Sequence, residues 1–206
     1  MVWLIELTLI LMTGLLTFHA ARTRSTQFML IFWFSGLIMS ILREFALVKI
    51  SEYYTYGDFH LTILGIPLVF LLLWPNLCYV SWEWSNGYLG MEYFHAKSWD
   101  QHLPLIFVTM IFVSFFFEAL LSQYQLIHWQ MDTMPTLWGS TPALAPYAYG
   151  FTGVIFMKSF KILWDKPQQS WPLAAIRIAA LQPLLVLVLV GSLFLVDRTI
   201  ILIFAD

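Results

Sequence analysis

Cysteine and charged side chains are scarce in this chain of 206 residues. Its single cysteine, Cys78, excludes an intrachain disulfide and a thiolate metal cluster, and its apolar surroundings predict a packing role. Charged residues make up 11% of the chain and hydrophobic residues 60%, whereas a soluble domain has about 25% and about 45–50%. The sequence therefore predicts an integral membrane protein.

Several motifs that would indicate other functions are also missing. A net charge of −2 without a basic stripe excludes nucleic acid as a partner. The chain has no glycine-rich phosphate loop, no nucleophile elbow and no DDxxD motif, which argues against a prenyltransferase that holds diphosphate through magnesium. The histidines lack HxxxH or HxxE spacing, so we expect no metal site and no cofactor.

Six apolar stretches are long enough to cross about 30 Å of hydrocarbon as helices. They cover residues 2–20, 27–45, 61–82, 103–124, 144–164 and 173–196. The first has no basic region before it, so we expect a permanent span rather than a signal peptide. The predicted fold class is all-α, a polytopic transmembrane helix bundle that forms a single domain over residues 1–206.

The basic residues sort by side when the chain crosses six times. One side receives Arg22, Arg24, Lys97, Lys158, Lys161, Lys166 and Arg177. The other side receives Arg43, Lys49 and Arg198. The positive-inside rule places the first group in the cytoplasm and both termini outside, and we expect a bacterial inner membrane.

Two glutamates stand where an apolar environment is expected. Glu118 lies inside the apolar run 103–121, and Glu44 follows the apolar run 28–42. An acidic group at membrane depth costs about 2.5–3.5 kcal/mol on insertion scales, so its presence indicates a function. The two are 74 residues apart, and the same offset relates Asp58 to Asp132 and Gly65 to Gly139. We interpret this as a parallel internal repeat that sets the two glutamates facing each other across a cavity.

Glu118 follows three phenylalanines, the last of them Phe117, and has no basic residue within a turn. A carboxyl in such a place is expected to be partly desolvated and protonated. A protonated acid beside aromatic faces is what the protonation of an alkene requires, because the faces stabilise the resulting carbocation. The alternative is a structural hydrogen bond to a Ser, Thr or Tyr of a neighbouring helix.

The segment 43–60 is the densest polar region, with three acids, two bases, three tyrosines and a histidine. Irregular polar backbone beside a span either lines a cavity or meets the membrane interface. For Tyr53 and Tyr54 the interface is favoured, since tyrosines collect at headgroup depth. Further along, His128 and Asp132 are four residues apart and would pair if that stretch is helical.

From Glu44 to Trp74 the sequence reads E-x7-E-Y-Y-x-Y-G-D-x6-G-I-P-x6-W. This resembles the membrane carotenoid biosynthesis family that includes the γ-carotene and bisanhydrobacterioruberin hydratases. The matching positions are Glu44, Tyr54, Tyr56, Gly65, Pro67 and Trp74. In the second half the chain offers Glu118 and Gly139-Ser-Thr-Pro142, without the family's Asp-Pro step. The resemblance implies addition of water across the terminal double bond of a linear polyene.

Our first hypothesis is therefore an enzyme acting on a hydrophobic polyene or isoprenoid taken from the lipid bilayer. Glu118 or Glu44 would donate the proton, and capture of the cation by water or by an internal alkene would make a hydratase or a cyclase. The predicted catalytic residues are Glu44, Glu118, Asp58 and Asp132. The predicted substrate-binding residues are Tyr54, Tyr56, Trp74, Phe117, His128 and Trp138.

Two other functions stay open at the level of the sequence. A non-catalytic subunit of a photosynthetic or respiratory membrane complex would use the many aromatic residues for packing, and its buried acids would pair with Arg43 or Arg198. A proton-coupled transporter would suit parallel repeats, but the inner halves of the second and fourth spans carry no polar steps.

Overall fold

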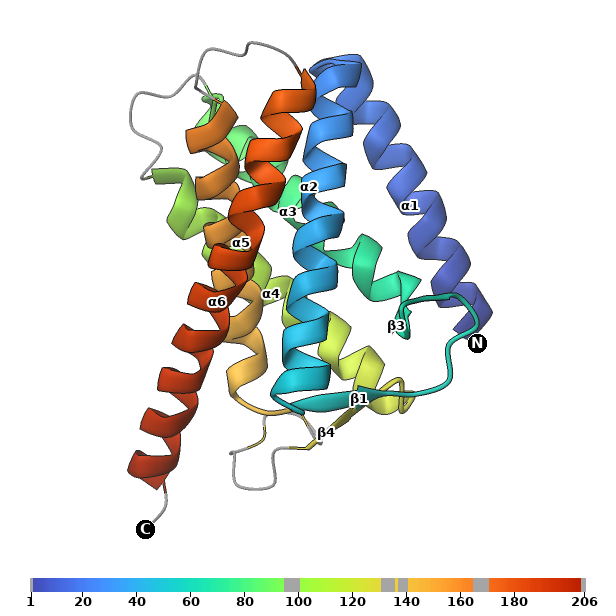
Figure 1. The fold of residues 1–206 in the computed structure, drawn as a ribbon, viewed down its shortest axis with the longest axis vertical. Helices are drawn as coiled ribbons and strands as arrows, with labels where there is room; N and C mark the ends of the chain where they lie inside the picture. The colour runs from blue at the N-terminus through green and yellow to red at the C-terminus, as the bar shows by residue number, and fades with distance from the viewer. Residues whose placement is uncertain (1, 95–100, 131–135, 137–140, 165–170, 205–206) are drawn as a thin grey trace.

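The structure, a computed structural model, describes residues 2–94, 101–130, 136, 141–164 and 171–204. These residues form a bundle of six α-helices, which confirms the predicted all-α class (Figure 1). The helices are α1 (Val2–Thr23), α2 (Thr26–Phe45), α3 (Leu68–Leu89), α4 (His102–Gln123), α5 (Leu144–Trp164) and α6 (Trp171–Phe204). Five of them begin or end within a few residues of the predicted spans.

Within the described residues, four segments are long and apolar enough to cross a membrane: Val2–Thr23, Thr26–Ile50, His102–Gln123 and Ala179–Val196. The chain is thus an integral membrane protein. Helix α1 buries three side chains, whereas α3 buries 13, so α3 lies inside the bundle. A helix that faces lipid must be apolar on its lipid side. The polar residues that lower the hydropathy of α3 are tolerated because they lie inside the bundle.

Helices α2 and α4 run in the same direction and end at the same end of the bundle (Figure 1). Helix α1 begins and α6 ends in that same half of the molecule. Each of α2 and α4 is followed by a short strand, β1 (Tyr54–Tyr56) and β4 (Ile127–Trp129). We call this end, where the two strands meet, the β1–β4 end.

The strands β1 and β4 pair antiparallel, with Tyr54 opposite Trp129 and Tyr56 opposite Ile127. Helix α2 passes first into a π-helix, η1 (Ala46–Ile50). Gly57 follows β1 closely against the other strand: a Cβ there would lie 2.4 Å from the Gln125 carbonyl oxygen. A helix at His128, which pairing with Asp132 would require, is not present. His128 lies in strand β4, where its backbone pairs with β1.

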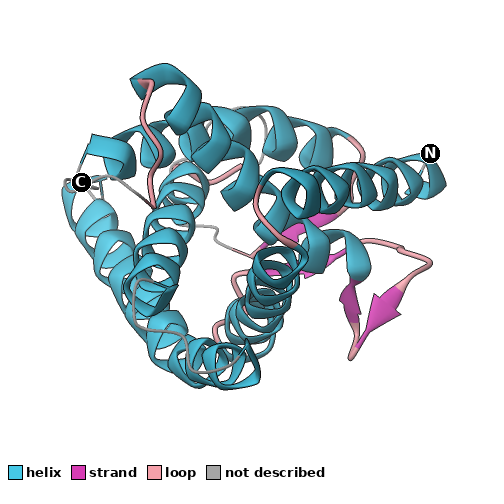
Figure 2. Ribbon diagram, turned by 90° about the horizontal axis from the view of Figure 1, so that it is seen from above, coloured by secondary structure: helices cyan, strands magenta, loops and turns pink. Residues whose placement is uncertain are grey.

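Helix α3 begins at Leu68, seven residues later than predicted. Residues 61–67 instead form a hairpin of β2 (Thr62–Ile63) and β3 (Ile66–Pro67), which projects at the edge of the bundle (Figure 2). Leu64 and Gly65 turn the chain with φ of 54° and 74°. An apolar run alone does not distinguish such a turn from the first turns of a helix.

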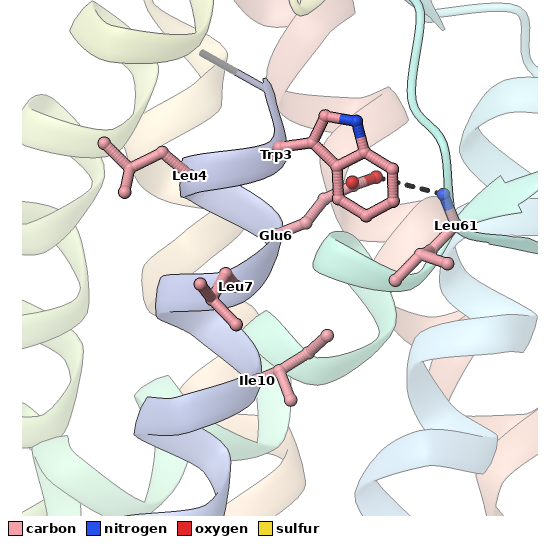
Figure 3. Close-up of a pocket in the computed structure, with 6 residues that line it drawn as sticks. All are labelled: Trp3, Leu4, Glu6, Leu7, Ile10 and Leu61. Carbon is pink, nitrogen blue, oxygen red and sulfur yellow. Dashed lines mark hydrogen bonds between the residues drawn. The ribbon is translucent and has the colours of Figure 1, made fainter.

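The hairpin is fastened to α1 by the buried carboxylate of Glu6. Its Oε1 accepts hydrogen bonds from the backbone N–H groups of His60 (2.9 Å) and Leu61 (3.0 Å), and the latter is drawn in Figure 3. Trp3 stacks on the His60 ring with centroids 4.3 Å apart. A surface pocket of about 390 Å³ opens beside these residues, with an apolar lining that includes Leu7. It lies outside the group of predicted site residues.

Small residues bring the helices together at two crossings. A Cβ on Gly36 of α2 would lie 2.6 Å from Pro75 Cβ of α3. A Cβ on Gly150 of α5 would lie 2.6 Å from the Phe107 ring of α4. Because lipid offers no hydrophobic driving force between helices, such close backbone approach is a main source of their association.

At the opposite end of the bundle, Arg24 ties the α1–α2 turn to the end of α3. Its Nη2 lies 3.2 Å from Glu83 Oε1 and 2.7 Å from Glu92 Oε2. Burial disfavours the guanidinium charge, but the two carboxylates outweigh it and raise the pKa of Arg24. This end is therefore held by charge pairs at every pH at which the acids are ionised.

Candidate functional site

Glu44 is fully buried at the end of α2 and accepts hydrogen bonds from four side chains. Oε1 receives Arg43 Nη1 at 2.5 Å and Trp74 Nε1 at 2.8 Å. Oε2 receives the hydroxyls of Tyr54 and Tyr56, each at 2.6 Å. Both lone-pair regions of each oxygen are thus engaged, and the carboxylate is a fixed acceptor.

Arg43 joins the two halves of the chain. Its guanidinium lies over the Trp74 ring, 3.7 Å from the centroid, and its Nε donates to Thr152 Oγ1 on α5 at 3.2 Å. The ion pair with Glu44 is buried on both sides, with 3% and 0% side-chain exposure. A buried charge is tolerated only when it is paired and hydrogen-bonded. Loss of either Arg43 or Glu44 would therefore leave the other as an unpaired buried charge.

The two tyrosines of β1 are held in their protonated form. Burial, and after it the carboxylate of Glu44, raises the pKa of Tyr54 and of Tyr56. Both phenols therefore remain donors over the physiological range, and Glu44 keeps its two hydroxyl partners. The sequence placed Tyr54 at the membrane interface; the structure buries it to 4% exposure.

Glu118 is buried like Glu44 but has far fewer hydrogen-bond partners. It is 4% exposed in α4, and its Oε1 accepts a hydrogen bond from the Tyr149 hydroxyl of α5 at 2.9 Å. Its Oε2 is buried and has no hydrogen-bond partner. The structural contact foreseen as an alternative is therefore present at one oxygen only. Within the described part of the chain Glu118 forms no ion pair.

The contacts of the two glutamates match across the predicted repeat. Glu44 is bonded by Trp74 in the helix that follows it, and Glu118 by Tyr149 in the helix that follows it. Offsets along the chain are 74 residues between the glutamates and 75 between Trp74 and Tyr149. These two aromatic rings touch, with centroids 4.7 Å apart. Residues that the predicted repeat would make equivalent thus lie against each other at the β1–β4 end.

A second equivalent pair is Tyr54 and Trp129, also 75 residues apart. They face each other in the β1–β4 ladder with ring centroids 5.0 Å apart. Tyr54 bonds Glu44 directly, whereas the Trp129 indole N–H faces Glu118 without reaching hydrogen-bond geometry and has no other partner.

A small internal cavity of about 20 Å³ lies at the junction of the halves. Its polar lining is Arg43, Tyr54, Trp74, Glu118, Trp129 and Tyr149, and its apolar lining is Phe70, Ile127, Ala145 and Ala148. Glu118, whose Oε2 is unpaired, thus lines the cavity together with five aromatic side chains. Its volume matches a water molecule and is far below that of an isoprenoid end.

The remaining predicted site residues lie apart from this cavity. Asp58 is exposed and lines a surface groove of about 350 Å³ together with Lys49 and Tyr56. His128 is exposed on β4, and Phe117 is partly buried against the core. Asp58 and His128 are thus not brought to the two glutamates. His128 points away because alternate residues of a strand point to opposite faces, and Asp58 lies beyond the end of β1, where the chain has turned outward. Asp132 and Trp138 lie outside the described residues.

Two residues of the site were missed by the sequence analysis, Tyr149 and Thr152. Tyr149 could have been found by extending the repeat from Trp74, since the one-residue insertion displaces it from the 74-residue frame. Thr152 carries no comparable signal. In the described part of the chain, no three His, Cys, Asp or Glu side chains gather as metal ligands.

Comparison with known proteins adds no relative: no family model, no curated protein and no solved structure matches this chain.

Proposed function

We propose that this chain is a membrane enzyme that protonates the terminal alkene of a polyene or isoprenoid, with Glu118 as the acid. The observation that carries the proposal is the unpaired, buried Oε2 of Glu118 facing a cavity lined by aromatic rings. The resemblance of the segment from Glu44 to Trp74 to carotenoid hydratases points to the same chemistry.

Glu118 acts in its neutral form. An ionised carboxylate oxygen buried without a donor is costly, so the proton resides on Oε2 while Oε1 accepts from Tyr149. When the proton passes to the alkene, the carbocation is stabilised by the faces of Trp74 and Trp129. Capture by water gives a tertiary alcohol, and capture by an internal alkene gives a ring.

Glu44 serves as the positioning acid. Its four donors leave it no free oxygen from which to deliver a proton. It neutralises Arg43, which otherwise would repel a carbocation beside the same cavity, and it orients Trp74. Of the two predicted proton donors, this geometry favours Glu118.

The substrate reaches the site from the bilayer, where apolar polyenes dissolve. The cavity is water-sized, so the lining side chains move apart when the alkene end enters. We place the β1–β4 end and both termini on the outer side of a bacterial inner membrane, following the distribution of basic residues.

A non-catalytic subunit of a larger membrane complex is the second candidate. The observation in its favour is the Arg43–Glu44 pair, which is the buried partnership that this function predicts. A subunit of this kind would use Glu118 only for its bond to Tyr149.

Expression in a carotenoid-producing bacterial host separates the two candidates. The enzyme adds the mass of one water to the pigment, or alters its retention at unchanged mass, and Glu118→Gln abolishes the change. The matched control is Asp58→Asn, which removes an exposed carboxylate at the same end and leaves the product unchanged. Unchanged pigment from well-accumulated wild-type protein would refute the enzyme, and accumulation only beside a partner would favour the subunit.

A further inference from the structure

Two residues that line the same cavity each have a buried polar atom without a hydrogen-bond partner. One is Oε2 of Glu118 on α4, and the other is Nε1 of Trp129 on β4. Buried polar groups in native proteins are almost always hydrogen-bonded, to protein or to ordered water. Two such atoms on residues of one cavity therefore point to a shared partner that is not a side chain.

The cavity has the size for that partner. Its volume of about 20 Å³ exceeds the roughly 10–15 Å³ that one water needs, and leaves no room for a second. A buried water also needs at least two polar partners. Here the Glu118 carboxyl can donate to the water or accept from it, and the Trp129 indole N–H can donate to it.

The first half of the predicted repeat offers a comparison for this arrangement. There Tyr54, the equivalent of Trp129, donates directly to Glu44 at 2.6 Å. In the second half the indole stops short of the carboxyl, and the cavity lies at that place. The change from tyrosine to tryptophan thus replaces a direct hydrogen bond with a neighbouring indole that makes no well-formed bond to the carboxyl.

We propose that Glu118 and Trp129 bind one water molecule, and that this water is the reactant that adds to the carbocation. The second part rests on the proposed function and makes the enzyme a hydratase rather than a cyclase. The N–H of Trp129 positions the water, a role separate from that of its ring face beside the carbocation.

The step balances in atoms and protons. Glu118 gives its Oε2 proton to the terminal alkene: the π bond breaks, one C–H bond forms, and a tertiary cation remains. The water oxygen forms the C–O bond with one lone pair while the other accepts from Trp129. A water proton then returns to Oε2 of Glu118. One water is added, the acid is regenerated, and no oxidant or reductant is needed.

A crystal structure of the wild-type protein in lipid, at a resolution that shows waters, tests the site without any substrate. The expected result is one density peak within hydrogen-bond distance of Oε2 of Glu118 and Nε1 of Trp129. A direct bond between the two side chains, or a cavity without density, would overturn the proposal.

Pigment products of Trp129→Phe test the role of the water. Phenylalanine keeps a ring to pack on Tyr54 but has no N–H, so the ratio of alcohol to non-hydrated products should fall by about tenfold, the effect of one hydrogen bond. Trp129→His restores a ring N–H and should recover part of the ratio. An unchanged ratio in Trp129→Phe would refute the reactant role. A bound water in a protein that converts no pigment would uphold the site and refute the proposed function.

Discussion

Trp74 and Tyr149 lie with their ring centroids 4.7 Å apart, and each donates a hydrogen bond to a different buried glutamate. Trp74 holds Glu44 and Tyr149 holds Glu118, so the contact between the rings joins the two acids of the repeat. The acids differ in their partners, since among the described residues Glu44 forms an ion pair with Arg43 and Glu118 forms none. Under the proposed function, this difference makes Glu44 the structural acid and Glu118 the reactive one.

Replacing each acid by its amide should separate these roles. Glu118→Gln keeps a carbonyl oxygen for Tyr149 and replaces the acidic hydroxyl by an amide, which does not protonate an alkene. Product should therefore fall by about 100-fold or more while thermal stability is kept. Glu44→Gln leaves Arg43 as an unpaired buried charge and should destabilise the protein by about 3–5 kcal/mol. Thermal unfolding in detergent, measured beside product formation, checks both. Equal loss of stability in the two variants would contradict the assignment.

The Arg43–Glu44 pair should behave as one unit in a double-mutant cycle. Arg43→Met alone strands the buried carboxylate and should cost about 3–5 kcal/mol, whereas Arg43→Met with Glu44→Leu should recover most of that loss. The midpoint of chemical unfolding for the two single variants and the double variant gives the coupling. Lys49→Met, which removes an exposed charge nearby, is the control and should change little. Additive losses would show that the two residues act independently.

Gly57→Ala should separate β1 from β4. Its new Cβ would lie 2.4 Å from the Gln125 carbonyl oxygen, which belongs to backbone and has little freedom to yield. We expect a loss of about 1–3 kcal/mol, as for other overpacked sites. Gly87→Ala in α3 meets no atom within 4 Å and should be neutral or stabilising. Thermal unfolding of the pair is the measurement, and similar values for both would argue against a close β1–β4 contact.

Alkaline pH should weaken the β1–β4 end. The pKa values of Tyr54 and Tyr56 are raised in the folded protein, first by burial and then by Glu44. Their contribution is complete below about pH 10, the value for unfolded tyrosine, and is lost as the pH rises above it, by about 1.4 kcal/mol per pH unit for each phenol. Stability measured up to about pH 11 should fall less steeply in Tyr56→Phe than in the wild type. The exposed Tyr88→Phe should leave the slope unchanged.

Much of the helical framework was predictable because hydrocarbon-crossing segments need length and uniform apolarity, which a sequence displays. The start of α3 was not, since the hairpin at Leu64 and Gly65 is as apolar as a helix and depends on Glu6, far away in the chain. The pairing of β1 with β4 was also beyond prediction. Strands of three residues have no periodicity to detect, and their partner is fixed by the arrangement of the helices.

At the site, the sequence identified the carboxylates more easily than their partners. A glutamate within an apolar run is conspicuous, and the motif from Glu44 to Trp74 contains three of the four donors to Glu44. Tyr149 stands in an ordinary aromatic stretch and becomes meaningful only through its bond to Glu118. Asp58 was overvalued because its 74-residue offset from Asp132 suggested a place beside the glutamates, whereas the structure exposes it after β1.

Product formation in heavy water asks whether Glu118 delivers the first proton. The account predicts that product made by the wild type carries one non-exchangeable deuterium on the carbon beside the new alcohol or ring carbon, whether hydration or cyclisation follows. Glu118→Gln, at equal protein level, should form no deuterated product. Product without deuterium from the wild type, or the same deuterated product from Glu118→Gln, would contradict the role of Glu118 as the acid.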